Sequence, residues 1–243
     1  MTKTPPSSEG PAGTVLALFA HPDDEAFRCG GTLALLAQRG HRVQVVTATR
    51  GEGGSCGTPP LCLPEELAAW RERELACSCA ALGLDPPVLL DYRDGTLADV
   101  ILAEAVGQVL ATAHRLAPHA LLTWPAHGLS GHPDHCAVSR WAEGVFAATS
   151  SLAALYHLAV PQSVAQRLGL SKLHATADSA IDLIVDVTAL WETKMAAIGC
   201  HRTQWHESPI LAAPLERQQL FLGVEHFVRA AARGNADPLQ ALL

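Results

Sequence analysis

A chain of 243 residues, 49% of them hydrophobic and 17% charged, is long enough for one large globular domain or two small ones. The net charge is −7 and lysine and arginine form no cluster, so we expect neither nucleic acid nor an anionic membrane surface as the main partner. No apolar run approaches the ~18 residues that a membrane-spanning helix needs, and the N-terminal residues lack the apolar core of a signal peptide, which favours a cytoplasmic protein.

Residues 14–148 alternate between strand and helix patterns, after a stretch over 1–13 that is rich in Pro, Ser and Gly and that we expect to be a disordered leader. Apolar or β-branched runs of strand length occupy 15–19, 42–48, 88–90 and 119–124. Helical patterns follow them over 22–39, 64–82, 99–116 and 133–148. Such alternation is typical of a parallel sheet with right-handed crossovers, so it predicts an α/β fold.

The pattern is less regular in the C-terminal third. Strand-like runs cover 155–160 and 181–187, and a helical pattern covers 190–198. No linker rich in Pro, Gly or Ser divides the chain, so we expect residues 14–243 to form a single domain. The seven cysteines include no C-x-x-C pair, and we interpret most of them as reduced thiols, with Cys56 and Cys62 either incidental or able to pair.

One stretch, His21-Pro22-Asp23-Asp24-Glu25, lies where the first predicted strand turns into the first predicted helix. Ligands bind at the carboxyl ends of strands in open α/β sheets. Pro22 suits the first position of the helix, and His21 and Asp24 can reach one point beyond the strand. An imidazole and a carboxylate that meet at one point suit zinc, although acidic residues in a first helical turn can also serve only to complement the helix dipole.

A second stretch of the same layout, His132-Pro133-Asp134-His135, follows the predicted strand over 119–124. Because parallel strands end at the same edge of a sheet, the two stretches together offer His21, Asp24 and His135 as three ligands and leave a fourth position open. Three protein ligands plus a water is the pattern of catalytic zinc. We therefore predict one Zn²⁺ per chain, with other divalent metals as alternatives.

Two further side chains of these stretches suit hydrolysis. Asp23 adjoins a ligand but should point elsewhere, and we predict that it is the general base that takes a proton from water. His132 would stabilise an oxyanion or protonate a leaving amine. Asp134 either orients His132 or only complements the helix dipole.

The chain resembles the LmbE-like/PIG-L family of zinc-dependent de-N-acetylases. The resemblance rests on three stretches in this order, namely His21-Pro22-Asp23-Asp24-Glu25, Thr49-Arg50-Gly51-Glu52 and Gly131-His132-Pro133-Asp134-His135, and more weakly on Lys194 with His201-Arg202-Thr203-Gln204. It implies the LmbE-like fold, a Rossmann-like, mostly parallel sheet with helices on both faces. It also implies that an N-acetylglucosamine-type sugar or small glycoside is hydrolysed at its amide to acetate and a free amine.

The resemblance also implies roles for individual residues. By matched position, the zinc ligands are His21, Asp24 and His135, the base is Asp23 and the electrophilic or acid group is His132. Weaker matches suggest three substrate contacts, which are Arg50, Asp94 and His201.

The substrate stays open among precursors of small thiols, chitin-derived sugars and antibiotic glycosides. We expect a small-molecule substrate, a homo-oligomer, and a pocket rimmed by the segments 53–64 and 156–176, since loops at this edge carry specificity. Three alternatives are an amidase of a related thiol conjugate, a non-catalytic metal- or sugar-binding protein, and a dinucleotide-binding module. The last is disfavoured because the first turn reads His-Pro-Asp-Asp rather than G-x-G-x-x-G.

Overall fold

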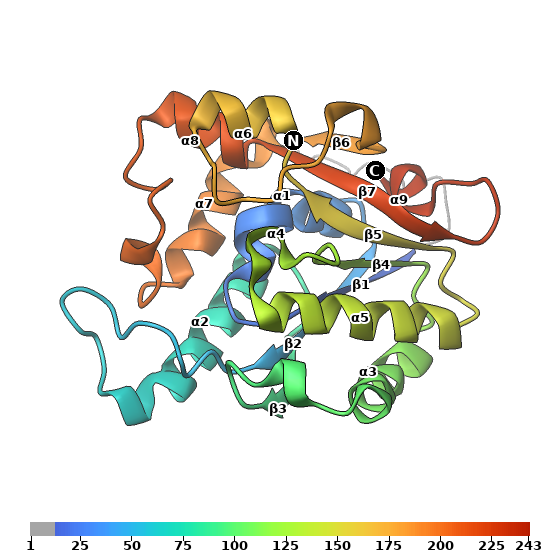
Figure 1. Cartoon of the computed structure of the whole chain (residues 1–243), viewed down its shortest axis with the longest axis horizontal. Helices are drawn as coiled ribbons and strands as arrows, with labels where there is room; N and C mark the ends of the chain where they lie inside the picture. The colour runs from blue at the N-terminus through green and yellow to red at the C-terminus, as the bar shows by residue number, and fades with distance from the viewer. Residues whose placement is uncertain (1–12) are drawn as a thin grey trace, which may run out of the picture.

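A seven-stranded sheet forms the centre of the computed structural model, which describes residues 13–243 (Figure 1). Its strands, in spatial order, are β3 (Val88–Tyr92), β2 (Arg42–Thr49), β1 (Thr14–Phe19), β4 (Ala120–Thr123), β5 (Ala154–Ala159), β7 (Val224–Ala232) and β6 (Leu183–Asp186). The first five run parallel, while β7 is antiparallel to both of its neighbours. The mostly parallel α/β sheet is therefore confirmed, whereas the leader expected over 1–13 lies outside the described residues except for Gly13.

Helices cover both faces of this sheet (Figure 1). They are α1 (Asp24–Gln38), α2 (Leu67–Ala81), α3 (Leu102–Leu116), α4 (Gly128–Gly131), α5 (Pro133–Ala148), α6 (Gln162–Leu168), α7 (Trp191–Cys200), α8 (Leu215–Leu222) and α9 (Pro238–Leu242). Alternate residues of β1 contact the two helical layers: Val15 and Phe19 pack with α1 and α2, whereas Leu16 and Leu18 pack with α3 and α5. A strand buried on both faces is apolar throughout for this reason. None of the helices within 13–243 combines the length and apolarity needed to cross a bilayer.

The strands and helices predicted up to residue 148 are all present, with some shifted ends. α1 begins at Asp24 instead of Pro22, for a reason given below with the site. α3 begins at Leu102 instead of residue 99, because Leu97–Asp99 forms a separate short 3₁₀ turn. The second His-Pro stretch behaves as predicted, since Pro133 is the first residue of α5.

The C-terminal third contains more regular structure than the sequence predicts. The expected strands and helix correspond to β5, β6 and α7, but the sequence patterns miss α6, α8, α9 and β7. β7 contains Glu225 and three alanines, residue types with low strand propensity. It pairs along both edges, with β5 and with β6, so tertiary pairing outweighs its local preference.

A disulfide joins α2 to α7. This disulfide links Cys77 to Cys200, which are 123 residues apart in sequence. It differs from the sequence-based expectation, which named only Cys56 and Cys62 as able to pair. A pairing between such distant residues depends on how the helices pack, and no local spacing indicates it. The cysteines at 29, 56, 62, 79 and 136 are free thiols, so the reduced state expected for most cysteines holds for these five.

Candidate active site

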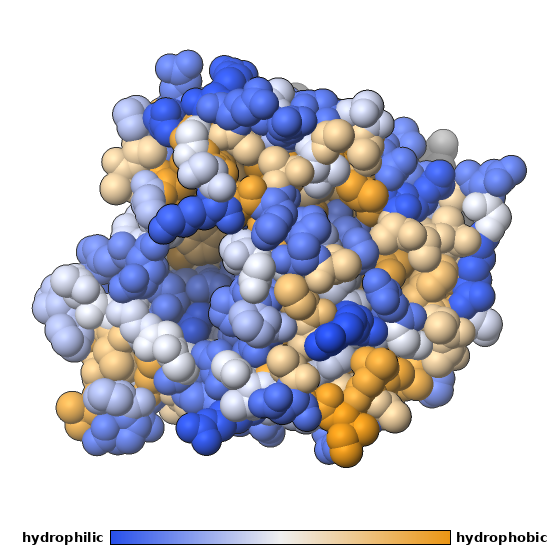
Figure 2. All heavy atoms as spheres, viewed as in Figure 1, coloured by the Kyte–Doolittle hydropathy of each residue, from blue (hydrophilic) through white to orange (hydrophobic). Residues whose placement is uncertain are grey.

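The sequence stretches that carry the candidate catalytic and metal-binding residues meet at the carboxyl edge of the parallel strands. They follow β1, β2, β3 and β4, and together they surround a cavity of about 270 Å³. The lining residues are His21, Asp23, Asp24, Gly53, Gly54, Arg71, Asp94, His132 and His135. Figure 2 shows that this face of the molecule is hollowed beside α4 and that hydrophilic residues line much of the hollow.

Three potential metal ligands converge on one side of this cavity. His135 Nε2 lies 3.3 Å from His21 Nδ1 and 3.5 Å from Asp24 Oδ1, and His21 Nδ1 lies 3.9 Å from Asp24 Oδ2. Ligands bound to zinc at about 2.0–2.1 Å in a tetrahedron are separated from each other by about 3.4 Å. The spacing of His21, Asp24 and His135 therefore fits the three protein corners of such a site.

Hydrogen bonds on the far side of each imidazole orient these ligands. His21 Nε2 donates to Asp94 Oδ1 at 3.0 Å and to Asp134 Oδ2 at 3.2 Å. His135 Nδ1 donates to the Gly128 carbonyl at 3.2 Å. Both rings thus turn their other nitrogen toward Asp24. Carboxylate or carbonyl partners of this kind are the usual supports of metal-binding histidines.

The Asp134 carboxylate contacts His21 and not His132, so it does not orient the His132 ring as one sequence-based alternative expected. Asp134 is fully buried, and its carboxylate also accepts the backbone N–H groups of Gly95 at 2.7 Å and Leu97 at 3.0 Å. Burial lowers the pKa of His21, but the hydrogen bonds that it donates to Asp134 and Asp94 outweigh this effect and raise that pKa to about 10. The loop after β3, which carries Gly95 and Leu97, is thereby tied to the metal-ligand cluster.

Asp24 is held by its own set of donors. Its Oδ2 atom accepts the backbone N–H of Ala20 at 3.1 Å and of His21 at 3.0 Å, and the indole N–H of Trp124 at 3.0 Å. Burial opposes ionisation of Asp24, but His135, His21 and these donors hold its pKa below the usual value. Trp124 also stacks on the His135 ring, with the two centroids 4.3 Å apart.

The backbone at Asp23 separates the two neighbouring aspartates. Asp23 has φ 104° and ψ −28°, in the left-handed region that non-glycine residues rarely adopt, and it forms the N-cap of α1. This conformation delays the helix to Asp24, so Pro22 lies in the preceding turn and not at the first helical position. As a result Asp24 faces the two histidines, while the Asp23 side chain lines the cavity with 24% of its surface exposed.

Within residues 13–243, the Asp23 carboxylate has one charged partner, Arg71. Arg71 Nη2 donates to Asp23 Oδ2 at 3.1 Å. Burial raises the pKa of Asp23, and the Arg71 guanidinium offsets this only in part, so the pKa lies at about 6. This pKa is close to neutral pH, and a general base is most effective when its pKa lies near the pH of the reaction.

The arginine that lines the cavity is Arg71 and not Arg50. From α2 it donates to the carbonyl of Gly51 at 2.7 Å and reaches the cavity. Arg50 instead pairs with Glu72 at 2.8 Å and with Asp91, and it is not among the residues that line the cavity. Arg71 belongs to an alternating run of Arg and Glu over residues 71–74. Such charge patterning is typical of an exposed helix, so the local sequence does not indicate that Arg71 lines a cavity.

His201 lies behind the site, not in it. It is fully buried, and its Nε2 contacts Glu25 Oε1 at 2.7 Å, an atom that also accepts the Ser78 hydroxyl at 2.6 Å. The other Glu25 oxygen accepts the backbone N–H of Asp23 at 3.0 Å. The substrate contact expected of His201 is therefore replaced by an indirect role, in which a buried Glu25–His201 pair holds the turn at Asp23.

His132 faces the ligand cluster across the cavity. Its ring centroid lies 4.9 Å from that of His21 and 4.7 Å from that of His135. Its Nδ1 accepts the backbone N–H of Asp134 at 3.2 Å, which caps α5. In the neutral ring the proton must then be on Nε2, so His132 offers the cavity a hydrogen-bond donor.

Of the two segments expected to rim the pocket, only one contributes lining residues. Gly53 and Gly54 belong to the long loop after β2, and the Gly53 N–H donates to Asp94 Oδ2 at 3.0 Å. The segment 156–176 contributes none among the described residues. Tyr156 is buried, and its hydroxyl donates to Asp237.

Comparisons with known proteins match this chain to one family. Residues 16–146 match the family model described as PIG-L, GlcNAc-PI de-N-acetylase. A relative from Acidothermus cellulolyticus, named 1D-myo-inositol 2-acetamido-2-deoxy-alpha-D-glucopyranoside deacetylase, is 30% identical over 267 residues, which cover 93% of this chain and 90% of the relative.

Solved structures share the fold. The N,N'-diacetylchitobiose deacetylase of Pyrococcus horikoshii has a TM-score of 0.66 at 22% identity, covering 89% of this chain and 83% of that one. GalB, the 4-carboxy-2-hydroxymuconate hydratase of Pseudomonas putida KT2440, has a TM-score of 0.68 at 17% identity, covering 93% and 99%. Because one fold serves both a deacetylase and a hydratase, the chemistry has to be argued from the site.

Proposed function

The chain belongs to the PIG-L family of de-N-acetylases, and from this premise we propose that it is a zinc-dependent hydrolase that removes the acetyl group from an N-acetylglucosamine-type sugar or small glycoside. The products are acetate and a free amine. The observation that carries the proposal is the arrangement of His21, Asp24 and His135 around one point, with Asp23 and His132 at either side of the same cavity.

The donor set fits zinc. Two imidazole nitrogens and one carboxylate oxygen form the kind of three-ligand set that catalytic zinc sites use, and the three converge within 4.8 Å of one another. We assign one ion per chain to His21, Asp24 and His135. An ion held there supplies Lewis acidity toward a water molecule and toward the acetamide carbonyl.

Asp23 is the group that accepts the proton of the attacking water. It lines the cavity beside the ligand cluster, and its carboxylate has one oxygen bound to Arg71 and the other without a hydrogen-bond partner in the described chain. With its pKa at about 6, it is ionised near neutral pH and can pass the proton on toward the leaving nitrogen.

His132 acts on the opposite side of the scissile amide. Its Nε2–H donor faces the cavity, so it can stabilise the oxyanion that forms as the carbonyl carbon becomes tetrahedral, or donate its proton to the departing amine. The geometry of Arg71 suits a third role, since its guanidinium lies in the cavity wall and can donate to sugar oxygens. Asp94 has both oxygens engaged, with His21 and with Gly53, and supports the site more directly than it could bind a sugar hydroxyl.

The test is acetate release from a panel of acetylated amino sugars by the zinc-loaded protein. The panel contains N-acetylglucosamine, its methyl glycoside, N-acetylglucosaminyl-inositol and diacetylchitobiose. We expect acetate and amine in equal amounts from at least one member, and release at least about 10²-fold slower from Asp23→Asn. Asp85→Asn, which changes a surface carboxylate paired with Arg42, serves as the matched control and should be fully active. Zinc-loaded protein that releases acetate from none of them would refute the proposal.

A further inference from the structure

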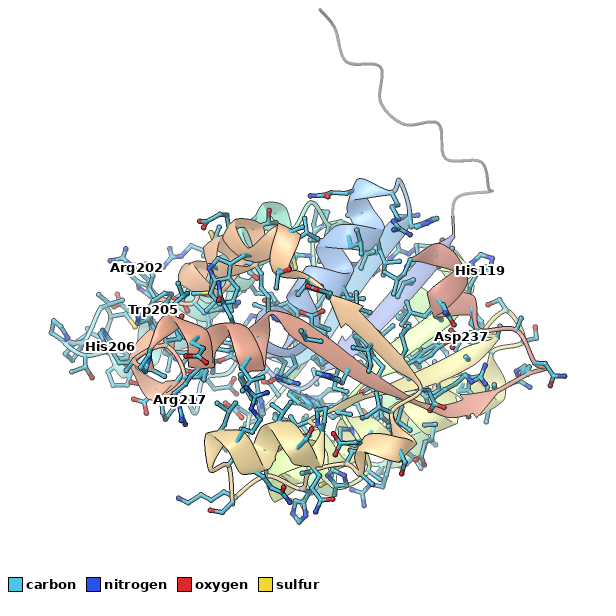
Figure 3. The ribbon with its side chains drawn as sticks, turned by 90° about the horizontal axis from the view of Figure 1, so that it is seen from above. His119, Arg202, Trp205, His206, Arg217 and Asp237 are labelled. Atoms are coloured by element: carbon cyan, nitrogen blue, oxygen red, sulfur yellow. A yellow bond between two sulfur atoms is a disulfide. The ribbon has the colours of Figure 1, made fainter. Side chains whose placement is uncertain are left out.

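A second cavity lies next to the catalytic one, and the reaction described above does not use it. It has a volume of about 370 Å³ and is lined by Thr58, Pro59, Leu61, Gly199, Arg202, Trp205 and His206. Figure 3 shows Arg202, Trp205 and His206 close together at one end of the molecule. Its walls come from the long loop after β2 and from the segment that follows α7.

Gly54 lines the catalytic cavity and contacts the segment after α7. A Cβ atom at this residue would lie 2.7 Å from Arg71 Nη1, on the catalytic side, and 2.9 Å from Gln204 Oε1, on the side of the segment after α7. Gln204 Nε2 also donates to the Ser55 carbonyl at 2.7 Å. The loop around Gly54 therefore connects a wall of the catalytic cavity to the segment that forms part of the second one.

The wall of the second cavity is anchored to the same helix as Arg71. Thr203 donates its backbone N–H to Glu74 Oε1 at 2.8 Å and its hydroxyl to Glu74 Oε2 at 2.6 Å. Glu74 and Arg71 are one helical turn apart on α2. The position of the segment 202–206 relative to the catalytic site is thus set by buried contacts, which a binding site for one continuous substrate requires.

Three polar side chains of the second cavity have no partner within residues 13–243. Neither a hydrogen bond nor an ion pair involves the Arg202 guanidinium, the Trp205 indole N–H or the His206 imidazole, and none of their atoms is among the buried unpaired ones. They are therefore accessible and available. The Trp205 ring lies against Gly199, and Pro59 and Leu61 add apolar surface to the same cavity.

We propose that this cavity is a subsite for the aglycone of the substrate, and that it selects a ring that carries an anionic group. An indole face binds the face of a sugar or aromatic ring. A free guanidinium favours a carboxylate or phosphate, which it can bind through two parallel hydrogen bonds. The inference rests on the proposed function, because it places the acetamido sugar in the catalytic cavity and the rest of the glycoside across Gly54.

The test compares four N-acetylglucosaminides, with methyl, phenyl, 4-carboxyphenyl and 4-phosphophenyl aglycones. In zinc-loaded protein, Arg202→Gln should raise KM for the two anionic glycosides about tenfold or more relative to its effect on the phenyl glycoside. Trp205→Ala should raise KM for all three aryl glycosides about three- to tenfold relative to the methyl glycoside, and Trp205→Phe should restore most of the loss because it keeps a ring face. The two anionic arms show whether carboxylate or phosphate is preferred.

A matched control and a binding measurement complete the test. Arg167→Gln removes the same charge from exposed α6, outside both cavities, and should change none of the four KM values. Calorimetric Kd values for the same glycosides with zinc-loaded Asp23→Asn, with and without Arg202→Gln, decide the subsite even if no glycoside is turned over. Absent turnover with a discriminating Kd would overturn only the proposed reaction. Equal effects of Arg202→Gln on neutral and anionic glycosides, or none, would overturn the subsite.

Discussion

Two adjacent carboxylates, Asp23 and Asp24, point in different directions because the backbone between them turns sharply. The left-handed conformation of Asp23 directs its side chain into the cavity, and the helical Asp24 faces His21 and His135. Such a conformation is costly for a non-glycine residue and persists where the surroundings enforce it. Here the enforcing contacts are the Glu25 carboxylate on the Asp23 N–H and the Arg71 guanidinium on the Asp23 side chain.

Substitution of the two aspartates should therefore give different phenotypes. Asp23→Asn keeps the shape of the side chain but cannot accept a proton, so zinc should stay bound while kcat falls by about 10²- to 10⁴-fold. Asp24→Asn removes a charged ligand, so zinc occupancy should fall first and excess zinc should restore part of the activity. Zinc stoichiometry and steady-state kinetics on both variants check this, and loss of zinc from Asp23→Asn with retention by Asp24→Asn would reverse the assignment.

The rate should depend on pH through Asp23. Burial raises the pKa of this carboxyl to about 6, and only the ionised form can take a proton. The value of kcat/KM should then fall as pH decreases through about 6, approaching a tenfold loss per pH unit. A profile that stays flat from pH 7 to pH 5, with zinc shown to remain bound, would exclude Asp23 as the base.

At the residue scale, sequence patterns predict the ligand cluster but not its surroundings. His21, Asp24 and His135 follow from motif spacing and from the rule that parallel strands end at one edge. Arg71 and the Glu25–His201 pair do not, because their roles arise from contacts between elements far apart in sequence. Arg50 does not line the cavity for the same reason, since its ion pairs with Glu72 and Asp91 decide where it points.

At the scale of elements, local patterning predicts the strands that are buried on both faces and the helices between them. Strands such as β1 are apolar throughout and stand out in the sequence, and the helices between them end at glycines such as Gly40 and Gly83. The antiparallel addition of β7 and β6 is less visible. β7 is held in the sheet by its pairing with β5 and β6 and by Glu225. The Glu225 carboxylate accepts the backbone N–H groups of Gly31 and Thr32 in α1 and pairs with Lys194 of α7.

The disulfide between α2 and α7 should contribute to stability. Cys77 and Cys200 are next to Ser78 and His201, both of which contact Glu25, so the link ties together the two helices that support the turn at Asp23. Cys200→Ser should lower the free energy of unfolding by about 2–4 kcal/mol. Urea unfolding under non-reducing conditions measures this, with Cys62→Ser as the control that removes a free thiol. Equal midpoints for the two variants would show that the link adds nothing.

At the scale of the whole molecule, neutral histidines that are buried or partly buried make the fold sensitive to acid. Burial lowers the pKa values of His157 and His226 to about 4, from an ordinary value of 6.5. Between these values the unfolded chain binds more protons than the folded one, so stability is present above about pH 6.5 and is lost as pH falls toward 4. Asp23, with its raised pKa, acts in the opposite sense over part of this range.

The contribution of each histidine can be isolated by difference. Urea unfolding at pH 7 and at pH 5 should show a smaller loss of stability for His157→Phe than for the parent protein, because the variant has no imidazole to protonate in the unfolded state. His114→Gln, on exposed α3, serves as the control and should lose as much as the parent. An equal loss in all three proteins would place the acid sensitivity elsewhere.

The overall fold also explains how residues that are more than 100 positions apart form one site. β1 and β4 are neighbours in the sheet, so the turns that follow them bring His21 and His135 into contact although 114 residues separate them. The crossover helices make this possible, because each returns the chain to start the next parallel strand from the opposite edge. The central claim is that this contact holds a zinc ion needed for N-deacetylation.

A zinc titration of the chelator-stripped protein tests that claim most directly. Zinc is added in steps while bound metal and the rate of acetate release are measured on the same samples. Both should rise together and level off at one zinc per chain, and His135→Ala should neither bind zinc at that ratio nor release acetate. Full activity in the stripped protein, or activity that follows zinc in the His135→Ala variant as in the parent, would contradict it.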